Sequence, residues 1–231
     1  MPNVLMIVQA RMGSKRLANK MLQTLHNLHI IDWVYRRISE SNVTNTVFAI
    51  PEGEVDQKLA KHLNKKNNIK VFRGSESDVL GRFCGALNSI GGDYVVRVCG
   101  DNPFVSRKQI DNLIKFHLKG NYDYSYNHIP INNSYPNGLG AEIVDASTLL
   151  AINGLAKKKN QREHVFNYIW DNPSKFKIGT FDPLDKRLRR PDIKLDIDTL
   201  EDLNFFQSVD LHPNFSDFEI LKNVSYKNEY S

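Results

Sequence analysis

The sequence lacks any long apolar run and is poor in cysteine. Its 231 residues include two cysteines, Cys84 and Cys99, which lie in apolar surroundings at no metal-ligand spacing. We therefore expect inert core thiols in a reducing, cytoplasmic compartment rather than a disulfide framework. No apolar run approaches the roughly 20 residues that span a bilayer. Because Gln9 and Arg11 interrupt the first apolar run, we also expect no signal peptide and no membrane insertion.

Two well-known glycine-rich phosphate motifs are also missing from the amino-terminal segment. The Walker loop requires G-x-x-x-x-G-K-[ST], and the dinucleotide fingerprint requires G-x-G-x-x-G. The segment 6–22, MIVQARMGSKRLANKML, holds a single glycine and therefore matches neither. Any phosphate site here must use another arrangement.

Positive charge is in modest excess and is dispersed. The net charge is +5, from 31 lysines and arginines against 26 acidic residues. Outside the opening segment and the KKKN run at 157–160, acidic residues separate the basic ones, and the basic segments lack interleaved aromatics. A nucleic-acid partner is not favoured, and anionic small molecules explain the excess equally well.

Short apolar runs alternate with segments of helical periodicity, which predicts an α/β fold. We expect one domain over residues 1–231, with a mostly parallel central sheet flanked by helices and an irregular insertion at about 125–165. The predicted strands lie at 3–10, 46–50, 69–74, 93–100, 122–127, 139–145, 175–181 and 193–198. The predicted helices lie at about 31–41, 54–66, 77–90, 106–119, 146–158, 161–171 and 199–209.

The basic segment directly after the first predicted strand is a candidate phosphate site. In open α/β sheets, ligands bind at the carboxyl ends of the strands. Backbone N–H groups around Gly13 and Ser14 can contact phosphate oxygens, and Arg11 and Lys20 supply positive charge. A solvated basic turn explains the charge pattern equally well at this point.

Six ordered motifs between residues 9 and 203 resemble the cytidylyltransferases that make CMP-activated acidic sugars, most closely the spore coat polysaccharide biosynthesis branch. The first is similar to the signature A-R-x-x-S-x-R-x-x-x-K. The resemblance implies a Rossmann-like nucleotidyltransferase fold, CTP as donor, Mg²⁺ as cofactor, pyrophosphate as product, and a homodimer with contacts in the insertion. The motifs are QARMGSKRLANKML, VFRGSESDVLGRF, VVRVCGDNPFV, YPNGLGAEI, REHVFNYI and LDIDTLEDL.

The resemblance also implies roles for individual residues of the nucleotide site. Arg11 and Lys20 would hold the triphosphate, while Ser14 and Arg16 complete the phosphate cradle. Lys15 stands at a position that varies in the family and is left out. The remaining nucleotide-binding residues are predicted to be Gln9, Ala10, Gly13, Arg82, which matches a residue near the base, and Asp101.

Two aspartates at strand ends are the predicted metal ligands. Asp101 follows the fourth predicted strand, and Asp198 matches the family's metal-binding aspartate, with Asp196 in reserve because the two alternate along a strand. Mg²⁺ held by carboxylates neutralises charge during nucleotidyl transfer. The structural alternatives are a turn residue for Asp101 and a helix N-cap for Asp198, paired with Glu201.

The acceptor half of the site is predicted from the fourth and fifth motifs. Asn137 and Gly140 replace two aspartates of the related pattern Y-P-D-G-L-D-x-E, which would favour a more anionic acceptor or be neutral. Arg162 could bind an acceptor carboxylate or phosphate, or equally form a helix-start ion pair or subunit contact. His164 is interpreted as structural rather than as a general base. The predicted acceptor-binding residues are Tyr135, Asn137, Glu142 and Arg162.

The resemblance, together with the residues that carry it, implies a CTP-dependent enzyme that transfers CMP to the anomeric hydroxyl of a 3-deoxy-ulosonic or nonulosonic acid for surface polysaccharide synthesis. Arg11, Lys20 and Asp101 are the predicted catalytic residues. One alternative is activation of a phosphorylated sugar, polyol or other small metabolite with CTP or UTP. A remote alternative is a non-catalytic module that binds polyanions.

Overall fold

The amino-terminal half of the chain supplies four parallel strands of the central sheet. The computed structural model describes residues 2–66 and 69–229. Neighbouring strands in this half pair in parallel, and their Val, Ile and Phe side chains are largely buried because helices cover both faces. The strands are β1 (Val4–Gln9), β4 (Asn45–Pro51), β5 (Lys70–Gly74) and β6 (Tyr94–Cys99).

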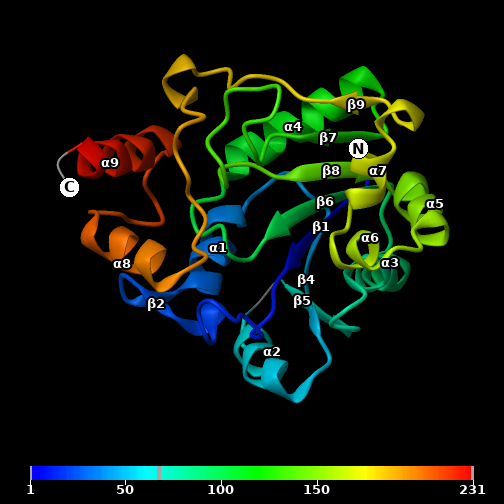
Figure 1. Cartoon of the computed structure of the whole chain (residues 1–231), viewed down its shortest axis with the longest axis horizontal. Coiled ribbons are helices and arrows are strands. Elements are labelled where there is room, and N and C mark those ends of the chain that lie inside the picture. The colour runs from blue at the N-terminus through cyan, green and yellow to red at the C-terminus, as the bar shows by residue number, and fades with distance from the viewer. Residues whose placement is uncertain (1, 67–68, 230–231) are drawn as a thin grey trace.

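Three later strands complete a seven-stranded sheet: β7 (Tyr124–Tyr126), β8 (Glu142–Asp145) and β9 (Ile178–Gly179). The order is β5-β4-β1-β6-β8-β7-β9, visible in Figure 1. Strand β8 is antiparallel to β6 and β7, whereas β7 is parallel to β9. The mostly parallel sheet is thereby confirmed, and the segment 125–165 contributes β8 and part of β7 to it.

Helices cover both faces of this sheet. The first face packs against α1 (Ile30–Ile38), α2 (Gln57–Leu63) and α4 (Arg107–Gly120). The second face packs against α3 (Val79–Ile90), α5 (Ala146–Leu155) and α7 (Asn167–Asp171). Successive strand residues point to opposite faces, so Met6 joins the first core and Ile7 the second.

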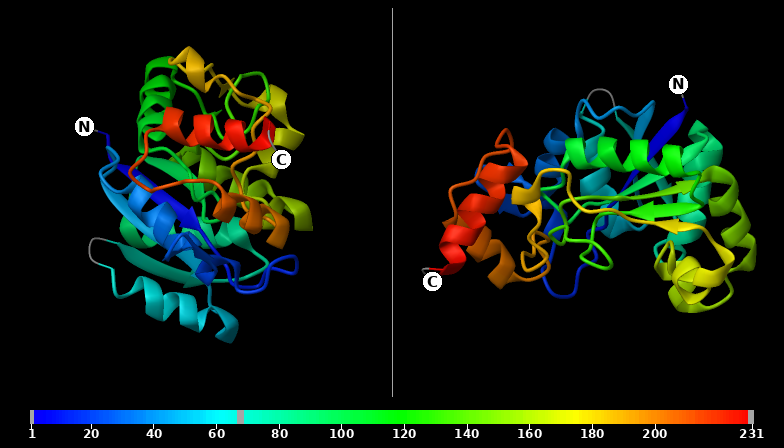
Figure 2. Two further views of the ribbon diagram at one scale, coloured as in Figure 1. Left: turned by 90° about the vertical axis from the view of Figure 1, so that its left-hand side faces the viewer. Right: turned by 90° about the horizontal axis from the view of Figure 1, so that it is seen from above.

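A third apolar cluster contains residues from both the amino-terminal and the carboxyl-terminal parts of the chain. It contains α8 (Leu200–Ser208) and α9 (Asp217–Glu229), which Figure 2 shows beyond one end of the sheet. The hairpin of β2 (Thr24–Leu25) and β3 (Leu28–His29) packs against α8. The sequence pattern predicted neither this hairpin nor α9. Short 3-10 helices lie at η1 (Lys20–Leu22), η2 (Glu54–Asp56), η3 (Pro173–Lys175) and η4 (Lys186–Leu188).

Several predicted elements were wrong in type or extent. Of the strand predicted at 175–181 only Ile178–Gly179 pairs in the sheet, and the helix predicted at 54–66 is η2 followed by α2. The segment 193–198 is extended but is not a strand of the sheet, because its backbone bonds go to loops: an isolated bridge joins Asn137 to Lys194. The single helix predicted at 161–171 is divided into α6 (Lys159–Glu163) and α7, because the chain turns inward to bury Val165 and Phe166. None of the helices in the described part of the chain has the length and apolar character of a membrane span.

Candidate active site

Buried apolar side chains and backbone hydrogen bonds hold the basic loop after β1 in place. Met12 and Leu17 are buried, which leaves the intervening polar residues at the surface. The backbone N–H of Met12 donates to Asp56 Oδ1 at 2.7 Å, and the N–H of Leu17 donates to Ser14 Oγ at 3.3 Å. Asn19 adopts a left-handed conformation, with φ of 54°, immediately before η1. These anchors turn the chain so that Lys20 points back toward the sheet.

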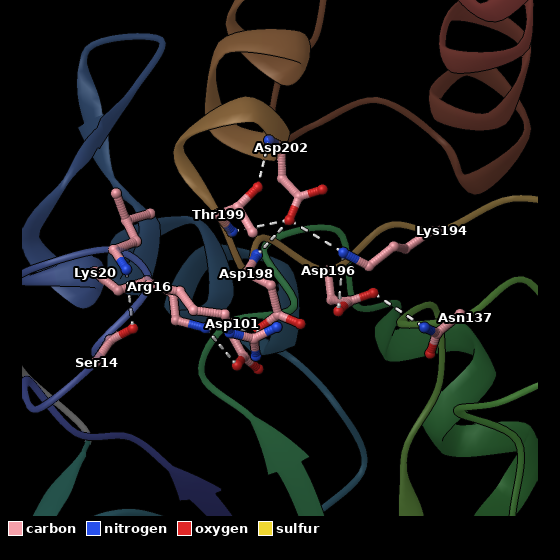
Figure 3. A network of polar contacts seen from close by, with 11 residues as sticks. Ser14, Arg16, Lys20, Asp101, Asn137, Lys194, Asp196, Asp198, Thr199 and Asp202 are labelled. Carbon is pink, nitrogen blue, oxygen red and sulfur yellow. Dashed lines mark hydrogen bonds and ion pairs between the residues drawn. The ribbon is translucent and has the colours of Figure 1, made fainter.

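Lys20 joins the two predicted metal ligands. Its side chain is 8% exposed, and Nζ donates to Asp101 Oδ2 at 2.9 Å and to Asp198 Oδ1 at 3.1 Å. Arg16, which is more exposed, also reaches Asp198 Oδ1 at 3.0 Å. Figure 3 shows the two carboxylates converging on these cations. Two residues separated by 97 positions in the sequence are thereby brought to one point at the carboxyl edge of the sheet.

Nearby charge and burial have opposite effects on the pKa of Asp198. Partial burial raises the pKa of its carboxyl group, but the hydrogen bond and charge of Lys20 and the charge of Arg16 lower it more. The net result is a pKa below the ordinary value, so Asp198 is ionised near neutral pH.

Backbone contacts explain why Asp101 and Asp198 meet. The N–H of Ile197 donates to the carbonyl of Asp101 at 3.0 Å, which fixes the late segment beside the end of β6. Gly100 permits the close approach of β1, because an added Cβ would lie 2.9 Å from the carbonyl oxygen of Gln9. The aspartate after Gly100 therefore sits directly opposite the basic loop.

The N-cap alternative for Asp198 was wrong. The cap of α8 is Thr199, whose hydroxyl accepts from the N–H of Asp202 at 3.2 Å, while the Asp202 carboxylate accepts from the N–H of Thr199. This capping box satisfies the first turn of the helix without the Asp198 side chain, which remains available to Lys20.

Asp196 faces a different set of partners. Asn137 Nδ2 donates to Asp196 Oδ1 at 3.0 Å, and Lys194 Nζ lies 3.6 Å from Oδ2. Burial raises the pKa of Asp196 above its ordinary value. The reserve ligand therefore lies beside the pair, turned toward Asn137, as Figure 3 also shows.

A cavity of about 490 Å³ brings most of the predicted nucleotide residues together. Hollows of comparable volume occur elsewhere on the surface. The lining distinguishes this one, since it combines the basic loop with the carboxylates. The predicted residues in its wall are Gln9, Ala10, Arg11, Gly13, Ser14, Arg16, Lys20, Asp101 and Asp198, joined by Lys15, Met21, Glu76, Arg97, Cys99 and Glu163.

Arg97 is a largely buried cation of the cavity wall that the sequence pattern did not identify. It lies in β6 opposite Glu142 of β8, and its Nη1 donates to Glu142 Oε2, while Nε donates to Gln9 Oε1 at 2.9 Å. Tyr124 O–H donates to the other oxygen of Glu142 at 2.5 Å. The available signal was a charged residue in the middle of the apolar strand VVRVC.

Glu142 thus neutralises Arg97 instead of lining the cavity. Burial raises the pKa of Glu142, but the charges of Arg97 and His128 and the hydrogen bonds from Tyr124 and Arg97 lower it more, so its pKa lies below the ordinary value. Of the other predicted acceptor residues, Tyr135 is fully buried and its O–H donates to Gln109 Oε1 at 3.0 Å. Neither side chain is brought to the cavity wall.

Arg82 is a buried side chain near the basic loop. It is 2% exposed, its Nη1 donates to the carbonyl of Ser75, and its Nε is buried without a hydrogen-bond partner among the described residues. Burial lowers its pKa to about 10, and the charge of nearby Arg11 acts in the same direction. Arg82 is therefore a buried side chain rather than a surface arginine of α3.

Arg162 forms the ion pair that was its structural alternative. Its Nη2 lies 2.6 Å from Asp78 Oδ2, and Nη1 donates to the carbonyl of Asn153 at 2.9 Å. Asp78 is in turn the N-cap of α3 and accepts from the N–H of Gly81 at 2.9 Å. In the same motif, Glu163 lines the cavity and His164 is exposed.

Replacing Arg162 with methionine should remove a pH-dependent contribution to stability. Burial raises the pKa of Asp78, but hydrogen bonds from Arg162 and Gly81 lower it more, to below the ordinary 3.8. A carboxyl whose folded pKa is depressed contributes stability above its unfolded pKa and loses it as the pH falls through the folded value. The difference in free energy of unfolding between wild type and Arg162→Met should therefore shrink below about pH 4. Urea unfolding from pH 7 to pH 3 measures it, and a difference independent of pH would contradict this account.

The two thiols differ in location. Cys84 is buried in the second core, where burial raises its pKa to about 11. Cys99 lines the cavity, yet burial raises its pKa to about 12. Both groups are therefore protonated near neutral pH, and neither is an activated nucleophile.

A mostly parallel sheet whose carboxyl edge carries a basic loop and two converging carboxylates has the arrangement of a nucleotidyltransferase. The chain belongs to the cytidylyltransferase family, which it matches over residues 5–229.

Individual relatives agree with this assignment. The chain is 34% identical over 231 aligned residues to the spore coat polysaccharide biosynthesis protein SpsF of Bacillus subtilis, covering 96% of this chain and 93% of SpsF. A solved cytidylyltransferase from Leptospira borgpetersenii is 27% identical, with a TM-score of 0.88 over 99% of this chain and 96% of that one. The structure of CMP:2-keto-3-deoxy-manno-octonic acid synthetase complexed with CTP shares the fold, at 16% identity and a TM-score of 0.64 over 89% of this chain and 97% of that one.

Proposed function

We propose that this enzyme transfers CMP from CTP to an acidic sugar and releases pyrophosphate, in the synthesis of a surface polysaccharide. One observation carries the proposal: the ammonium of Lys20 joins Asp101 and Asp198 beside the cations of the basic loop. Cations to hold a triphosphate and carboxylates to hold a metal ion therefore share one cavity. The relatives named for spore coat polysaccharide synthesis and for a CMP-linked octonic acid support this choice.

The triphosphate would lie along the loop after β1. Arg11 and Arg16 extend from this loop and Lys20 closes it, so the β- and γ-phosphates meet three cations within the cavity. The volume of about 490 Å³ is in the range of small-molecule sites. The charges of Arg82 and Arg11 interact, and on the resemblance Arg82 would stand near the base.

The carboxylate pair fits a divalent metal ion. It already surrounds a positive charge, the ammonium of Lys20, with one oxygen from each carboxylate. Carboxylate oxygens are the ligands that Mg²⁺ prefers, so Asp101 and Asp198 would hold Mg²⁺ here. The ion would neutralise charge on the α-phosphate and on the departing pyrophosphate.

The chain's own residues would act mainly by positioning and by charge. Arg11 and Lys20 would stabilise the β- and γ-phosphates as they depart, while the anomeric hydroxyl of the acceptor attacks the α-phosphorus in line. The P–O bond to the β-phosphate breaks as the new P–O bond forms, and the hydroxyl proton passes to solvent.

In the acceptor half of the site, several residues would act by orienting other side chains rather than by contacting the acceptor. We infer that Glu142 orients Arg97, which lines the cavity and can pair with the acceptor's carboxylate. Asn137 holds Asp196 beside the metal ligands. Tyr135 and Arg162 would support this half by packing and by the ion pair with Asp78, respectively.

Pyrophosphate release from CTP tests the proposal. Wild type with Mg²⁺ and a panel of ulosonic and nonulosonic acids should release pyrophosphate with one acceptor class, and the product should be a CMP-linked acid. Asp101→Asn and Asp198→Asn should lose most of this turnover. Asp192→Asn is a matched control, because that exposed carboxylate pairs with Arg190 away from the cavity. Full turnover in both site variants would contradict the assignment.

A phosphorylated acceptor is the second candidate. The observation that favours it is Asn137 and Gly140, which stand where the related pattern has two aspartates and so leave this side of the site less negative. Sugar and polyol phosphates, and UTP as donor, therefore belong in the same panel. Release only with a phosphorylated acceptor would select this alternative.

We also propose that the enzyme is a homodimer with contacts in the segment 125–165. Ile131 is 45% exposed there. Light scattering after size-exclusion chromatography distinguishes a 26.5 kDa monomer from a dimer.

A further inference from the structure

A second cluster of metal-ligating side chains lies away from the cavity, between α1 and α2. It consists of His29 at the N-cap of α1, Asp32 in the first turn of α1, and His62 near the end of α2. One ligand atom from each of the three residues lies within 4.8 Å of those of the other two. Two helices on the same face of the sheet thus bring two imidazoles and one carboxylate together.

The contacts inside this cluster are short and partly buried. His62 Nε2 lies 2.8 Å from Asp32 Oδ1, and the rings of His29 and His62 meet edge to face at 5.0 Å. Asp32 is 7% exposed, a degree of burial that carboxylates rarely reach unless they are paired. His29 Nδ1 is buried and has no hydrogen-bond partner within 2–66 and 69–229. Buried polar atoms in proteins almost always have a hydrogen-bond partner, and this ring nitrogen lacks one among the residues that the structure describes.

Lys66 supplies positive charge to the same carboxylate. Its Nζ lies 2.7 Å from Asp32 Oδ1 and 5.6 Å from the centre of the Tyr35 ring. Burial raises the pKa of Asp32, but the hydrogen bonds and charges of Lys66 and His62 lower it more, so its pKa lies below the ordinary value. Lys66 is 25% exposed, so its flexible side chain can leave toward solvent.

We propose that His29, Asp32 and His62 bind one divalent transition-metal ion of the Zn²⁺ or Co²⁺ class. Two imidazoles and a carboxylate suit these ions and not Mg²⁺, which prefers oxygen ligands. Three protein ligands leave a further position for water. Lys66 competes with the ion for Asp32 and moves away when the ion binds.

The position of α2 indicates what such an ion would do. At the other end of α2, Asp56 is 3% exposed and accepts from the N–H of Met12 in the basic loop at 2.7 Å. An ion at the cluster would join α2 to α1 and so stabilise the helix against which this loop is anchored. None of the three ligands lines the cavity, so an ion could bind here whatever reaction the cavity supports.

Co²⁺ titration of the full chain, with excess Mg²⁺ to saturate carboxylate sites, tests this proposal. Wild type should bind one Co²⁺ with visible ligand-field absorption that Zn²⁺ displaces. His62→Gln and His29→Gln should each weaken binding by at least about tenfold. His212→Gln, at an exposed histidine elsewhere, should leave it unchanged. Lys66→Met should strengthen binding, because the competing cation is gone.

Circular dichroism of each variant checks that it is folded, and two different ligand variants guard against misfolding of one. Absence of saturable absorption in wild type would overturn the proposal. Equal binding by wild type, His62→Gln and His29→Gln would overturn it as well, since the ion would then lie elsewhere.

Discussion

Replacing Lys20 with methionine should reduce turnover about 100-fold to 1,000-fold, the range found when one preorganised electrostatic group is removed from an active site. The ammonium is buried and contacts Asp101 and Asp198 directly. Without it, two carboxylates repel each other at the cavity, and the departing pyrophosphate loses one of its cations. The effect should appear in kcat as well as in kcat/KM, because charge on the leaving group develops in the transition state.

The matched control is Lys15→Met. Lys15 is exposed on the same loop, and no described hydrogen bond or ion pair joins it to either carboxylate. Its replacement should reduce turnover far less than Lys20→Met does. Steady-state pyrophosphate release measures both. Equal losses would show that the loop acts only through its overall charge and would contradict the specific role of Lys20.

Replacing Arg97 with leucine should lower the free energy of unfolding by about 3–5 kcal/mol, the cost of breaking a buried ion pair on one side. Glu142 is 4% exposed on its side chain and would be left in the sheet without its cation. The hydrogen bond from Arg97 to Gln9 would also be lost. Urea unfolding at neutral pH, followed by circular dichroism, measures the change.

The double variant Arg97→Leu/Glu142→Leu should be less destabilised than the two single variants combined, because it leaves no charge unpaired. Arg107→Leu is the control, since Arg107 pairs with Glu40 on the surface, where such pairs contribute about 1 kcal/mol or less. A cost for Arg97→Leu no larger than that for Arg107→Leu would contradict the importance of the buried pair.

Local signals explain why the first half of the fold was predictable. Runs such as VLMIVQ and VVRVC are largely apolar, which is typical of parallel strands that are buried on both faces. Each of these strands could therefore be predicted from its own sequence alone. The segment 193–198 alternates apolar and polar residues like a half-buried strand, yet its backbone bonds go to Asn137 and Asp101, which no local pattern reveals. Helix α9 has a weakly periodic sequence, and its burial depends on residues from the amino-terminal part of the chain.

The candidate site, like the fold, could be predicted only in part. The basic loop is contiguous, so Arg11, Arg16 and Lys20 could be predicted from one motif, and the structure brings them to one cavity with Asp101. Arg97 could not be assigned, because its partner Glu142 lies 45 residues later on an antiparallel strand. The predicted acceptor residues lie outside the cavity wall. Tertiary packing sets their contacts, and the sequence does not reveal it.

Calorimetric titration of CTP with and without Mg²⁺ tests the central claim most directly. Wild type should bind one CTP, and Mg²⁺ should strengthen this binding. In the variant Asp101→Asn/Asp198→Asn, that dependence on Mg²⁺ should disappear, because the carboxylates proposed to hold the ion are gone. If the double variant bound CTP as tightly as wild type and with the same dependence on Mg²⁺, the metal and triphosphate site would lie elsewhere in the molecule.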